Sequence, residues 1–155
     1  MNRPMLFTAS VIAVLTMGLG SAPSAAAFDL SEFRWKNRLI LLFAPDLRHP
    51  YLEAFEGEIA HWEAEVQDRD LVVFKIIESG PSVAGERPLE TFQAKALRKS
   101  LDITAGRFTV ILIGKDGGEK FRRNDRVSLR EIFSLIDAMP MRREEVRSRK
   151  AGQIK

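Results

Sequence analysis

The sequence predicts an α/β fold in which helices flank a four-stranded mixed sheet, with the element order β-α-β, α, β-β-α. Three short apolar runs, RLILLFA at 38–44, LVVFKII at 71–77 and FTVILI at 108–113, are typical of strands buried on both faces. A helical pattern separates the first two runs, and a glycine-containing turn follows the third. Strands joined by a helix are expected to be parallel, whereas strands joined by a tight turn are antiparallel.

The first strand is expected to end at Pro45, because proline has no N–H to donate to a neighbouring strand. A helix is predicted from about Pro50 to Val66, since proline is tolerated in the first helical turn. The apolar residues of this segment recur at the spacing of one helix face: Leu52, Phe55, Ile59, Trp62 and Val66. Trp35, just before the first strand, is expected to cover the core.

A loop is predicted over 78–88, which contains serine, glycine and proline. A second helix is then expected over 89–101. Its core-facing residues are predicted to be Leu89, Phe92 and Ala96, with Leu97 beside them.

The segment Lys115–Gly118 predicts a hairpin turn, and 119–122 is polar enough for the returning edge strand. Ser128 and Glu131 have the spacing of a capping box, which places the start of a third helix there. The apolar face of this helix consists of Leu129, Ile132, Phe133 and Ile136. Met139–Pro140 is expected to end it.

Residues 1–27 have the pattern of a cleaved secretory signal peptide. Arg3 is followed by an uncharged apolar stretch from Met5 to Leu19 and by small residues ahead of Phe28. The apolar stretch is shorter than the roughly 20 residues that span a bilayer. We therefore expect cleavage after Ala27, no stable membrane insertion afterwards, and a periplasmic or secreted location.

Residues 28–141 are then expected to form one domain, followed by a basic tail over 142–155. The tail carries six basic and two acidic residues, whereas the body carries 17 basic and 19 acidic residues. The overall charge of +3 therefore does not indicate a basic face, and nucleic acid is excluded as a partner. The tail is interpreted as a frayed polar terminus; a weak attraction to anionic lipid or polymer is the alternative.

Two segments of the chain resemble the redox site of thioredoxin-like proteins, although the sequence contains no cysteine. LLFAPDLRHP resembles the strand, Ala-Pro and CxxC segment, with Leu47 in place of the first cysteine. ITAGRFTVILIGKDGG resembles the cis-proline segment, with Phe108 in place of the proline and Thr109 after it. A non-proline cis bond costs about 2.5–4 kcal/mol, so we expect the Arg107–Phe108 bond to be trans.

A further resemblance covers nearly all of the chain after residue 27. WKNRLILLFAP, RDL, LIGKDGGEK and IDAMPMRR together resemble an uncharacterised bacterial family of exported proteins. That family is similar to the peroxiredoxin-like P-DUDES domains of vertebrate extracellular proteins of the sushi-repeat type. The resemblance implies a thioredoxin-like fold, export and an unassigned activity. Because thiol–disulfide exchange and peroxidase chemistry need a thiolate, both activities are excluded here.

The sequence is therefore interpreted as a non-redox binding module for a protein, peptide or envelope component, without cofactor or metal. Thioredoxin-like folds present a groove between the loop ahead of the first helix and the loop before the third strand. The residues expected to line it are Asp46, Leu47, Arg48, His49, Pro50, Arg107, Phe108 and Thr109. The substitution Phe108→Asp is expected to weaken partner capture while the fold survives.

The alternative is a small enzyme that uses His49 with Asp46 or Arg48 on an anionic substrate. It requires the imidazole to be accessible and to contact a second polar group. A purely structural interpretation of the same residues makes Asp46 a cap and His49 a helix-entry residue.

Other polar residues receive structural interpretations. Lys115 and Asp116 are expected to be turn residues, with partner recognition as the alternative. Arg142 and Arg143 are expected at a solvated helix end, where binding of a carboxylate or phosphate is the alternative. His61 is expected on a solvated helix face, because two separate histidines offer too few ligands for a metal site.

Overall fold

A computed structural model of the chain describes residues 28–153. The predicted signal peptide, 1–27, lies outside the described residues, as do the last two positions of the predicted tail. The elements in chain order are η1 (Leu30–Phe33, a 3-10 helix), β1 (Arg38–Ala44), α1 (Pro50–His61), α2 (Glu63–Asp68), β2 (Leu71–Ile77), β3 (Ser82–Ala84), β4 (Arg87–Leu89), α3 (Thr91–Ser100), β5 (Thr109–Ile113), β6 (Glu119–Arg123), α4 (Leu129–Asp137) and α5 (Pro140–Gly152).

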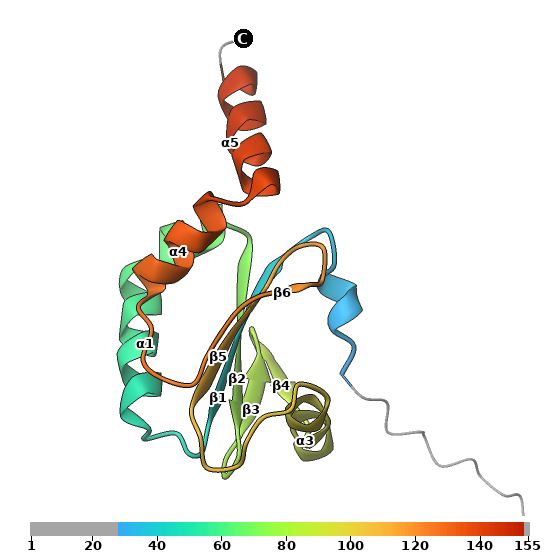
Figure 1. The fold of residues 1–155 in the computed structure, drawn as a ribbon, viewed down its shortest axis with the longest axis vertical. Coiled ribbons are helices and arrows are strands. Elements are labelled where there is room, and N and C mark those ends of the chain that lie inside the picture. Colours follow the sequence, from blue (N-terminus) through green and yellow to red (C-terminus); the bar gives the residue numbers. More distant parts are fainter. Residues whose placement is uncertain (1–27, 154–155) are drawn as a thin grey trace, which may run out of the picture.

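The strands form one mixed sheet in the order β4-β3-β2-β1-β5-β6 (Figure 1). β1 pairs in parallel with β2 and antiparallel with β5, and β6 returns antiparallel beside β5. The predicted α/β class, the parallel first pair and the final hairpin are confirmed. The sheet has six strands rather than the four expected.

The two additional strands come from the segment that was expected to be a loop. β3 pairs antiparallel with β2, and β4 pairs with β3 across a turn in which Gly85 has a φ of +61°. Each strand has three residues. Such short strands have too few positions to show alternation, so only the pairing of β3 with β2 and of β4 with β3 identifies them.

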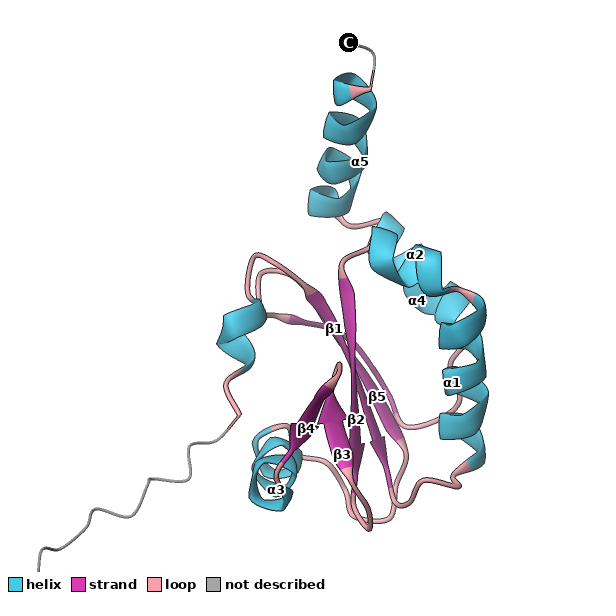
Figure 2. Cartoon of the chain, turned by 180° about the vertical axis from the view of Figure 1, so that it is seen from behind, coloured by secondary structure: helices cyan, strands magenta, loops and turns pink. Residues whose placement is uncertain are grey.

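Alternate residues of β1 belong to two separate cores, because successive side chains of a strand point to opposite faces of the sheet. Ile40, Leu42 and Ala44 pack with the apolar faces of α1 and α4. Leu39, Leu41 and Phe43 pack on the other face with α3 and the N-terminal segment. Figures 1 and 2 show α1 and α4 on one side of the sheet and α3 on the other.

Two of the predicted helices differ from expectation in detail. The first is interrupted at Trp62, which lies between α1 and α2, although its predicted apolar face does pack on the core. α3 buries Leu97, as predicted, but also Ala94, while Phe92 is exposed and Ala96 only half-buried, so the predicted inward face is correct at Leu97 and wrong at Phe92. Leu89 belongs to β4, and α3 begins at Thr91. A helical apolar face counted from Leu89 therefore does not coincide with the face that α3 buries.

Trp35 does not cover the core. Its side chain is 59% exposed, and its backbone has a φ of 66°. The backbone N–H of Trp35 donates to the carbonyl oxygen of Lys115 at 2.6 Å. Trp35 is therefore held by the hairpin turn through its main chain, and its ring faces solvent beside Arg34.

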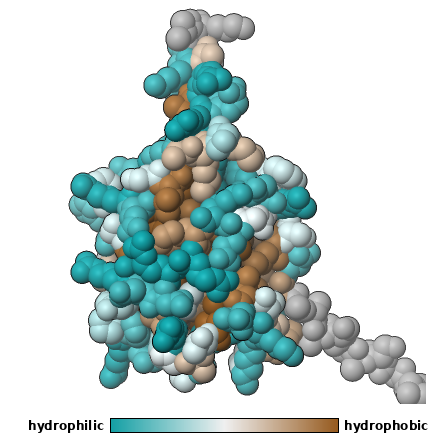
Figure 3. Space-filling model, in the orientation of Figure 1, coloured by the Kyte–Doolittle hydropathy of each residue, from teal (hydrophilic) through white to brown (hydrophobic). Residues whose placement is uncertain are grey.

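The predicted frayed terminus is helical over its described residues. Met139 is the N-cap of α5 and Pro140 its first residue, so this proline begins a new helix after α4. α5 extends beyond the body of the molecule (Figure 1), and its visible surface is largely hydrophilic (Figure 3). Its base is attached to the body, because Arg142 is buried there.

Candidate functional site

The loop after β1 is organised by short-range hydrogen bonds. The Asp46 carboxylate accepts a hydrogen bond from the backbone N–H of Arg48 at 2.8 Å. His49 is the N-cap of α1, and its Nδ1 accepts from the backbone N–H of Tyr51 at 3.3 Å. Pro50 occupies the first helical position, where no N–H is needed. His49 is therefore a helix-entry residue, as the structural interpretation expects, but the cap of α1 is His49 itself and not Asp46, whose carboxylate bonds within the loop.

The loop before β5 meets this first loop through aromatic rings. The His49 imidazole lies parallel to the Phe108 ring, with centroids 5.0 Å apart and an angle of 6° between the planes. Tyr51 contacts the same ring edge-on, at 5.6 Å. The described residues contain no cis peptide bond, so the Arg107–Phe108 bond is trans as predicted. The two segments predicted to face each other are therefore in contact.

The expected lining residues divide into exposed and buried sets. Leu47 is 47% exposed, and Asp46, Arg48, Pro50 and Arg107 are also exposed, with His49 half-buried. Phe108 is only 3% exposed, and Thr109 is buried with its hydroxyl donating to the Asn124 side chain at 3.0 Å. The expectation that Phe108 and Thr109 line an accessible groove is wrong, because both are part of the core beneath it.

Tyr51, which the sequence analysis did not select, joins the exposed set. Its position two residues after His49, in the first turn of the predicted helix, is the feature of the sequence that could have placed Tyr51 on this surface. We call this surface the loop face; it comprises Asp46, Leu47, Arg48, His49, Pro50, Tyr51 and Arg107.

The loop face does not contain the arrangement that the alternative enzyme requires. The Nδ1 of His49 is occupied by the helix backbone, and the ring packs on Phe108. Among the described residues, no hydrogen bond or ion pair joins His49 to Asp46 or Arg48. A general base needs a partner within hydrogen-bonding reach, so the geometry gives acid–base catalysis by these residues no support.

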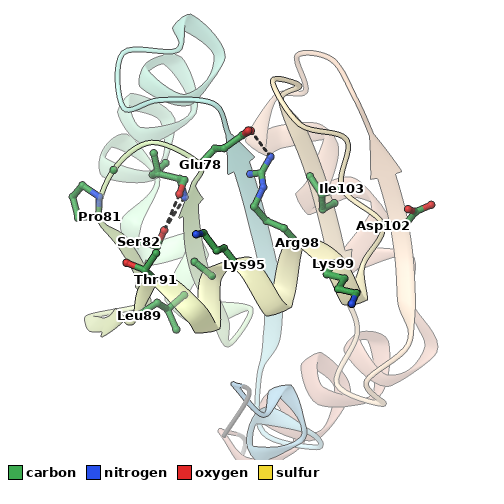
Figure 4. A pocket seen from close by; sticks show the side chains of 13 residues that line it. Glu78, Pro81, Ser82, Leu89, Thr91, Lys95, Arg98, Lys99, Asp102 and Ile103 are labelled. Atoms are coloured by element: carbon green, nitrogen blue, oxygen red, sulfur yellow. Dashed lines mark hydrogen bonds and ion pairs between the residues drawn. The ribbon is translucent and has the colours of Figure 1, made fainter. Parts of the chain in front are cut away.

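A cavity of about 440 Å³ lies next to the loop face, between α3 and the carboxyl end of β2 (Figure 4). Its lining residues are Ile77, Glu78, Gly80, Pro81, Ser82, Leu89, Thr91, Ala94, Lys95, Arg98, Lys99, Asp102 and Ile103. A Cβ added at Gly80 would lie 3.6 Å from Cγ of Leu47, so the cavity adjoins the loop face. We call it the α3 pocket.

Glu78 connects the α3 pocket to the loop before β5. Its Oε2 accepts from Nη2 of Arg98 and from the backbone N–H of Gly106, both at 2.8 Å. Gly106 adopts a φ of +70°, which glycine accepts without strain. One carboxylate therefore holds α3, β2 and the Gly106 loop together. The sequence pattern does not predict this cavity, because it indicates a different inward face for α3 and gives no signal for β3 and β4.

The hairpin and C-terminal candidates are held in ion pairs. Lys115 contacts Asp70 at 2.7 Å and Glu145 at 2.9 Å, and Asp116 accepts from Lys120 and the backbone of Gly118. These contacts favour the structural interpretation of the turn. Arg143 is exposed, as expected, but Arg142 is buried against Asp68, so the expectation of a solvated side chain is wrong for Arg142.

Two carboxyl groups at the base of α5 have lowered pKa values. Burial acts to raise the pKa of Glu145, but hydrogen bonds from Arg38 and Lys115 outweigh it. Burial likewise acts to raise the pKa of Asp68, and the hydrogen bond from Arg142 together with the charges of Arg142, Arg149 and Arg69 outweighs it. Both carboxylates are therefore stabilised in their charged form by the partners that attach α5.

Neither a metal site nor a membrane span is found in the part of the chain that the structure describes. Residues 28–153 contain no group of three or more His, Cys, Asp or Glu side chains placed to hold a metal ion. No helix within the same range combines the length and apolar character needed to cross a membrane.

Sequence comparison matches residues 29–145 to a family model described as Domain of unknown function (DUF4174). The chain is 26% identical over 142 residues to the sushi repeat-containing protein SRPX of Homo sapiens, which covers 90% of this chain and 30% of that protein. It is 26% identical over 130 residues to SRPX2 of Bos taurus, covering 82% and 28% respectively. The chain thus spans less than a third of the length of these relatives.

Structure comparison finds peroxiredoxins. The reduced 2-Cys peroxiredoxin of Plasmodium vivax matches with a TM-score of 0.56 and 14% identity, covering 74% of this chain and 84% of that one. Thioredoxin peroxidase I of Plasmodium yoelii matches with a TM-score of 0.55 and 17% identity, covering 74% and 79%. At these identities the likeness concerns the fold alone, and it confirms the predicted thioredoxin-like class.

Proposed function

Because the chain belongs to the DUF4174 family and carries a thioredoxin-like fold without cysteine, we propose that it is a non-redox binding module. Its partner is a protein, peptide or envelope component, bound at the loop face. The signal-peptide pattern of residues 1–27 supports a periplasmic or secreted location for this binding.

The absence of sulfur nucleophiles supports a binding role over a redox role. The structures with this fold are named as peroxiredoxins and a thioredoxin peroxidase, and the chemistry of such proteins requires a thiolate. In this chain Leu47 stands at the position that resembles the first cysteine. A leucine there contributes contact area and no chemistry.

The observation that carries the proposal is the stack of His49 on Phe108 in contact with the exposed Tyr51, with the exposed Leu47 in the same loop as His49. The stack joins the β1–α1 loop to the segment before β5, so the loop face has a fixed base. Leu47 and Tyr51 are large apolar or aromatic residues exposed within five positions of each other. Aromatic and aliphatic side chains on a rigid base are typical of residues that dominate binding energy at protein interfaces.

The flanking charges give the loop face its polar rim. Arg48 and Arg107 are exposed, one on each of the two loops, and Asp46 is engaged with the loop backbone. An apolar centre with arginines at the edge is a common composition for a protein-binding surface. The rim favours a partner segment that carries at least one carboxylate near an apolar side chain.

The proposal is tested by substituting Leu47. Immobilised protein and its Leu47→Asp variant are exposed to envelope extract from the source cells, and the retained proteins and peptides are quantified. We expect Leu47→Asp to reduce retention of the specific partner about tenfold or more, which corresponds to about 1.4 kcal/mol of binding energy.

The matched control is Leu135→Asp, which alters an exposed leucine on α4, at the far end of the sheet from the loop face (Figure 1). This variant should retain the partner as the unmodified protein does. Equal retention by Leu47→Asp and Leu135→Asp would contradict the proposal, since any loss would then reflect surface charge in general.

A further inference from the structure

The α3 pocket combines basic side chains with an apolar wall, and it has no part in the binding proposed above. Three of its lining residues are basic, Lys95, Arg98 and Lys99, and all three are on α3. Two are acidic, Glu78 and Asp102. The pocket therefore carries one net positive charge.

Arg98 is the buried member of the basic set. Its side chain is 11% exposed, and only its Nη2 is paired, with Glu78 at 2.8 Å. Its Nη1 is buried and has no hydrogen-bond acceptor among the described protein residues. A guanidinium has five N–H donors in a planar fork that matches a carboxylate, so Arg98 has donors left for a second oxygen acceptor, and the covered Nη1 has to turn toward the cavity to meet one.

The acidic residues of the pocket leave this capacity in place. Glu78 already accepts hydrogen bonds from Arg98 and from the backbone N–H of Gly106. Its negative charge is therefore compensated within the protein. Asp102 is exposed and lies just past the C-terminal end of α3. Lys95 and Lys99 make no ion pair with any described side chain, so their charges are available to a ligand.

The directions of these side chains are visible in the close view of the pocket. Lys95 and Arg98 lie on the side of α3 that faces the Glu78–Ser82 segment, whereas Lys99 ends nearer the C-terminal end of the helix (Figure 4). The hydroxyl of Ser82 is held by Ile77, accepting from its N–H at 2.8 Å and donating to its carbonyl oxygen at 3.3 Å. The wall opposite the basic residues is therefore fixed.

The remaining wall is apolar. Ile77, Leu89, Ala94 and Ile103 also line the cavity, and the first three are buried. A volume of about 440 Å³ is within the range of small-molecule pockets. An apolar wall beside convergent cationic groups matches a ligand with one anionic head and a hydrocarbon or aromatic body.

From these contacts we infer that the α3 pocket binds a small organic carboxylate, with its head between Lys95 and Arg98 and its body against Ile77, Leu89 and Ile103. The single net positive charge of the pocket favours a monoanion over a phosphate dianion. This ligand site is separate from the protein partner proposed for the loop face, and neither proposal depends on the other.

The test compares two probes with the same body, octanoate and octanol, titrated into the full protein by calorimetry and by amide NMR. We expect octanoate to bind at least tenfold more tightly than octanol and to shift the amide signals of Ala94 and Ile103. Equal affinities would overturn the inference, because the basic residues would then contribute nothing. Shifts confined to residues outside the pocket lining would also overturn it.

Two substitutions assign the charge to named residues. Lys95→Glu alters an exposed side chain, and Arg98→Gln removes the buried guanidinium; each should weaken octanoate at least tenfold and leave octanol unchanged. The control, Lys150→Gln, removes an exposed lysine on α5 and should leave both probes unchanged. If Arg98→Gln disturbs the fold by releasing Glu78, the result for Lys95→Glu alone tests the inference. Unaltered octanoate affinity in Lys95→Glu would overturn the assignment.

Discussion

Phe108 is a core residue that forms the base of the loop face. Its ring stacks under His49 and also packs with the apolar residues of β1, β5 and α4. An aspartate at this position would place a charge in that core, so the expectation that the fold survives Phe108→Asp does not agree with the burial of the residue. Substitutions that test the loop face must therefore be made at Leu47 or Tyr51, which lie at the surface.

Truncation of Phe108 should cost stability rather than binding alone. We expect Phe108→Ala to lower the free energy of unfolding by about 3–5 kcal/mol, the range for a buried phenylalanine. Urea denaturation followed by circular dichroism measures this change. Phe92→Ala, at an exposed phenylalanine on α3, should change it by less than about 1 kcal/mol. Similar losses in the two variants would show that Phe108 is not part of the core.

The start of α4 shows how a local signal and a distant contact act on one element. Ser128 is the N-cap, and its hydroxyl oxygen accepts from the backbone N–H of Glu131 at 3.2 Å, as the capping spacing predicts. The backbone N–H of Leu129 donates instead to the carboxylate of Glu58 on α1. The cap therefore fixes where α4 begins, and Glu58 ties that end to α1.

Loss of the cap should destabilise α4 measurably. We expect Ser128→Ala to reduce the free energy of unfolding by about 1 kcal/mol, because one N–H at the helix start loses its acceptor. The matched control is Ser134→Ala, since Ser134 lies within α4 and its exposed hydroxyl bonds only to the carbonyl oxygen of Arg130. This control should be near neutral. A larger loss in Ser134→Ala than in Ser128→Ala would contradict the capping role.

The whole molecule is held to its C-terminal helix by a group of ion pairs. Arg38 is 1% exposed and pairs with Glu145 at 3.1 Å, and Lys115 reaches the same carboxylate. Arg142 is buried against Asp68, and its Nη1 lies 3.9 Å from Oε2 of Glu145. These contacts connect β1, the hairpin turn, the end of α2 and α5, so α5 is joined to the fold mainly through charge.

Removal of the Glu145 charge should release this attachment. In Glu145→Gln the buried Arg38 loses its charged partner, and we expect a loss of about 3 kcal/mol in the free energy of unfolding at neutral pH. Glu144→Gln is the control, since the Glu144–Arg147 pair in the same helix is exposed on both sides. That variant should change stability by less than about 0.5 kcal/mol. Equal effects would show that burial of Arg38 plays no part.

The same ion pairs predict a loss of stability in acid. The pKa of Glu145 is lowered from its ordinary value of 4.5 in the folded state, so its contribution is complete above that value. It is lost as the pH falls below 4.5 through the lowered pKa, because the folded protein must then bind a proton that the unfolded chain already holds. Thermal unfolding against pH should therefore show a shallower acid decline in Glu145→Gln. If the decline of the unfolding temperature in acid were the same in both proteins, other carboxylates would be responsible for it and the prediction would be wrong.

Local sequence patterns determined the central part of this protein. The apolar runs of β1 and β2 are buried by helices on both sides of the sheet, so each is continuous enough to identify its strand to the residue. The helical spacing of α1 and α4 and the cap at Ser128 are likewise short-range signals. The sequence also shows directly that no cysteine thiolate is present for thiol–disulfide exchange. These features need no information about which distant residues come together.

Tertiary structure alone decided the features that depend on long-range pairing. The short strands β3 and β4 form because β2 offers an edge, and their residues Ser82 and Leu89 line the α3 pocket. Phe108 and Arg142 are buried by partners far along the chain, and Arg38 reaches Glu145 across 107 positions. The spacing of apolar residues indicates which face of a helix or strand is buried. It does not indicate which other element covers that face, or which acidic residue pairs with a given basic residue.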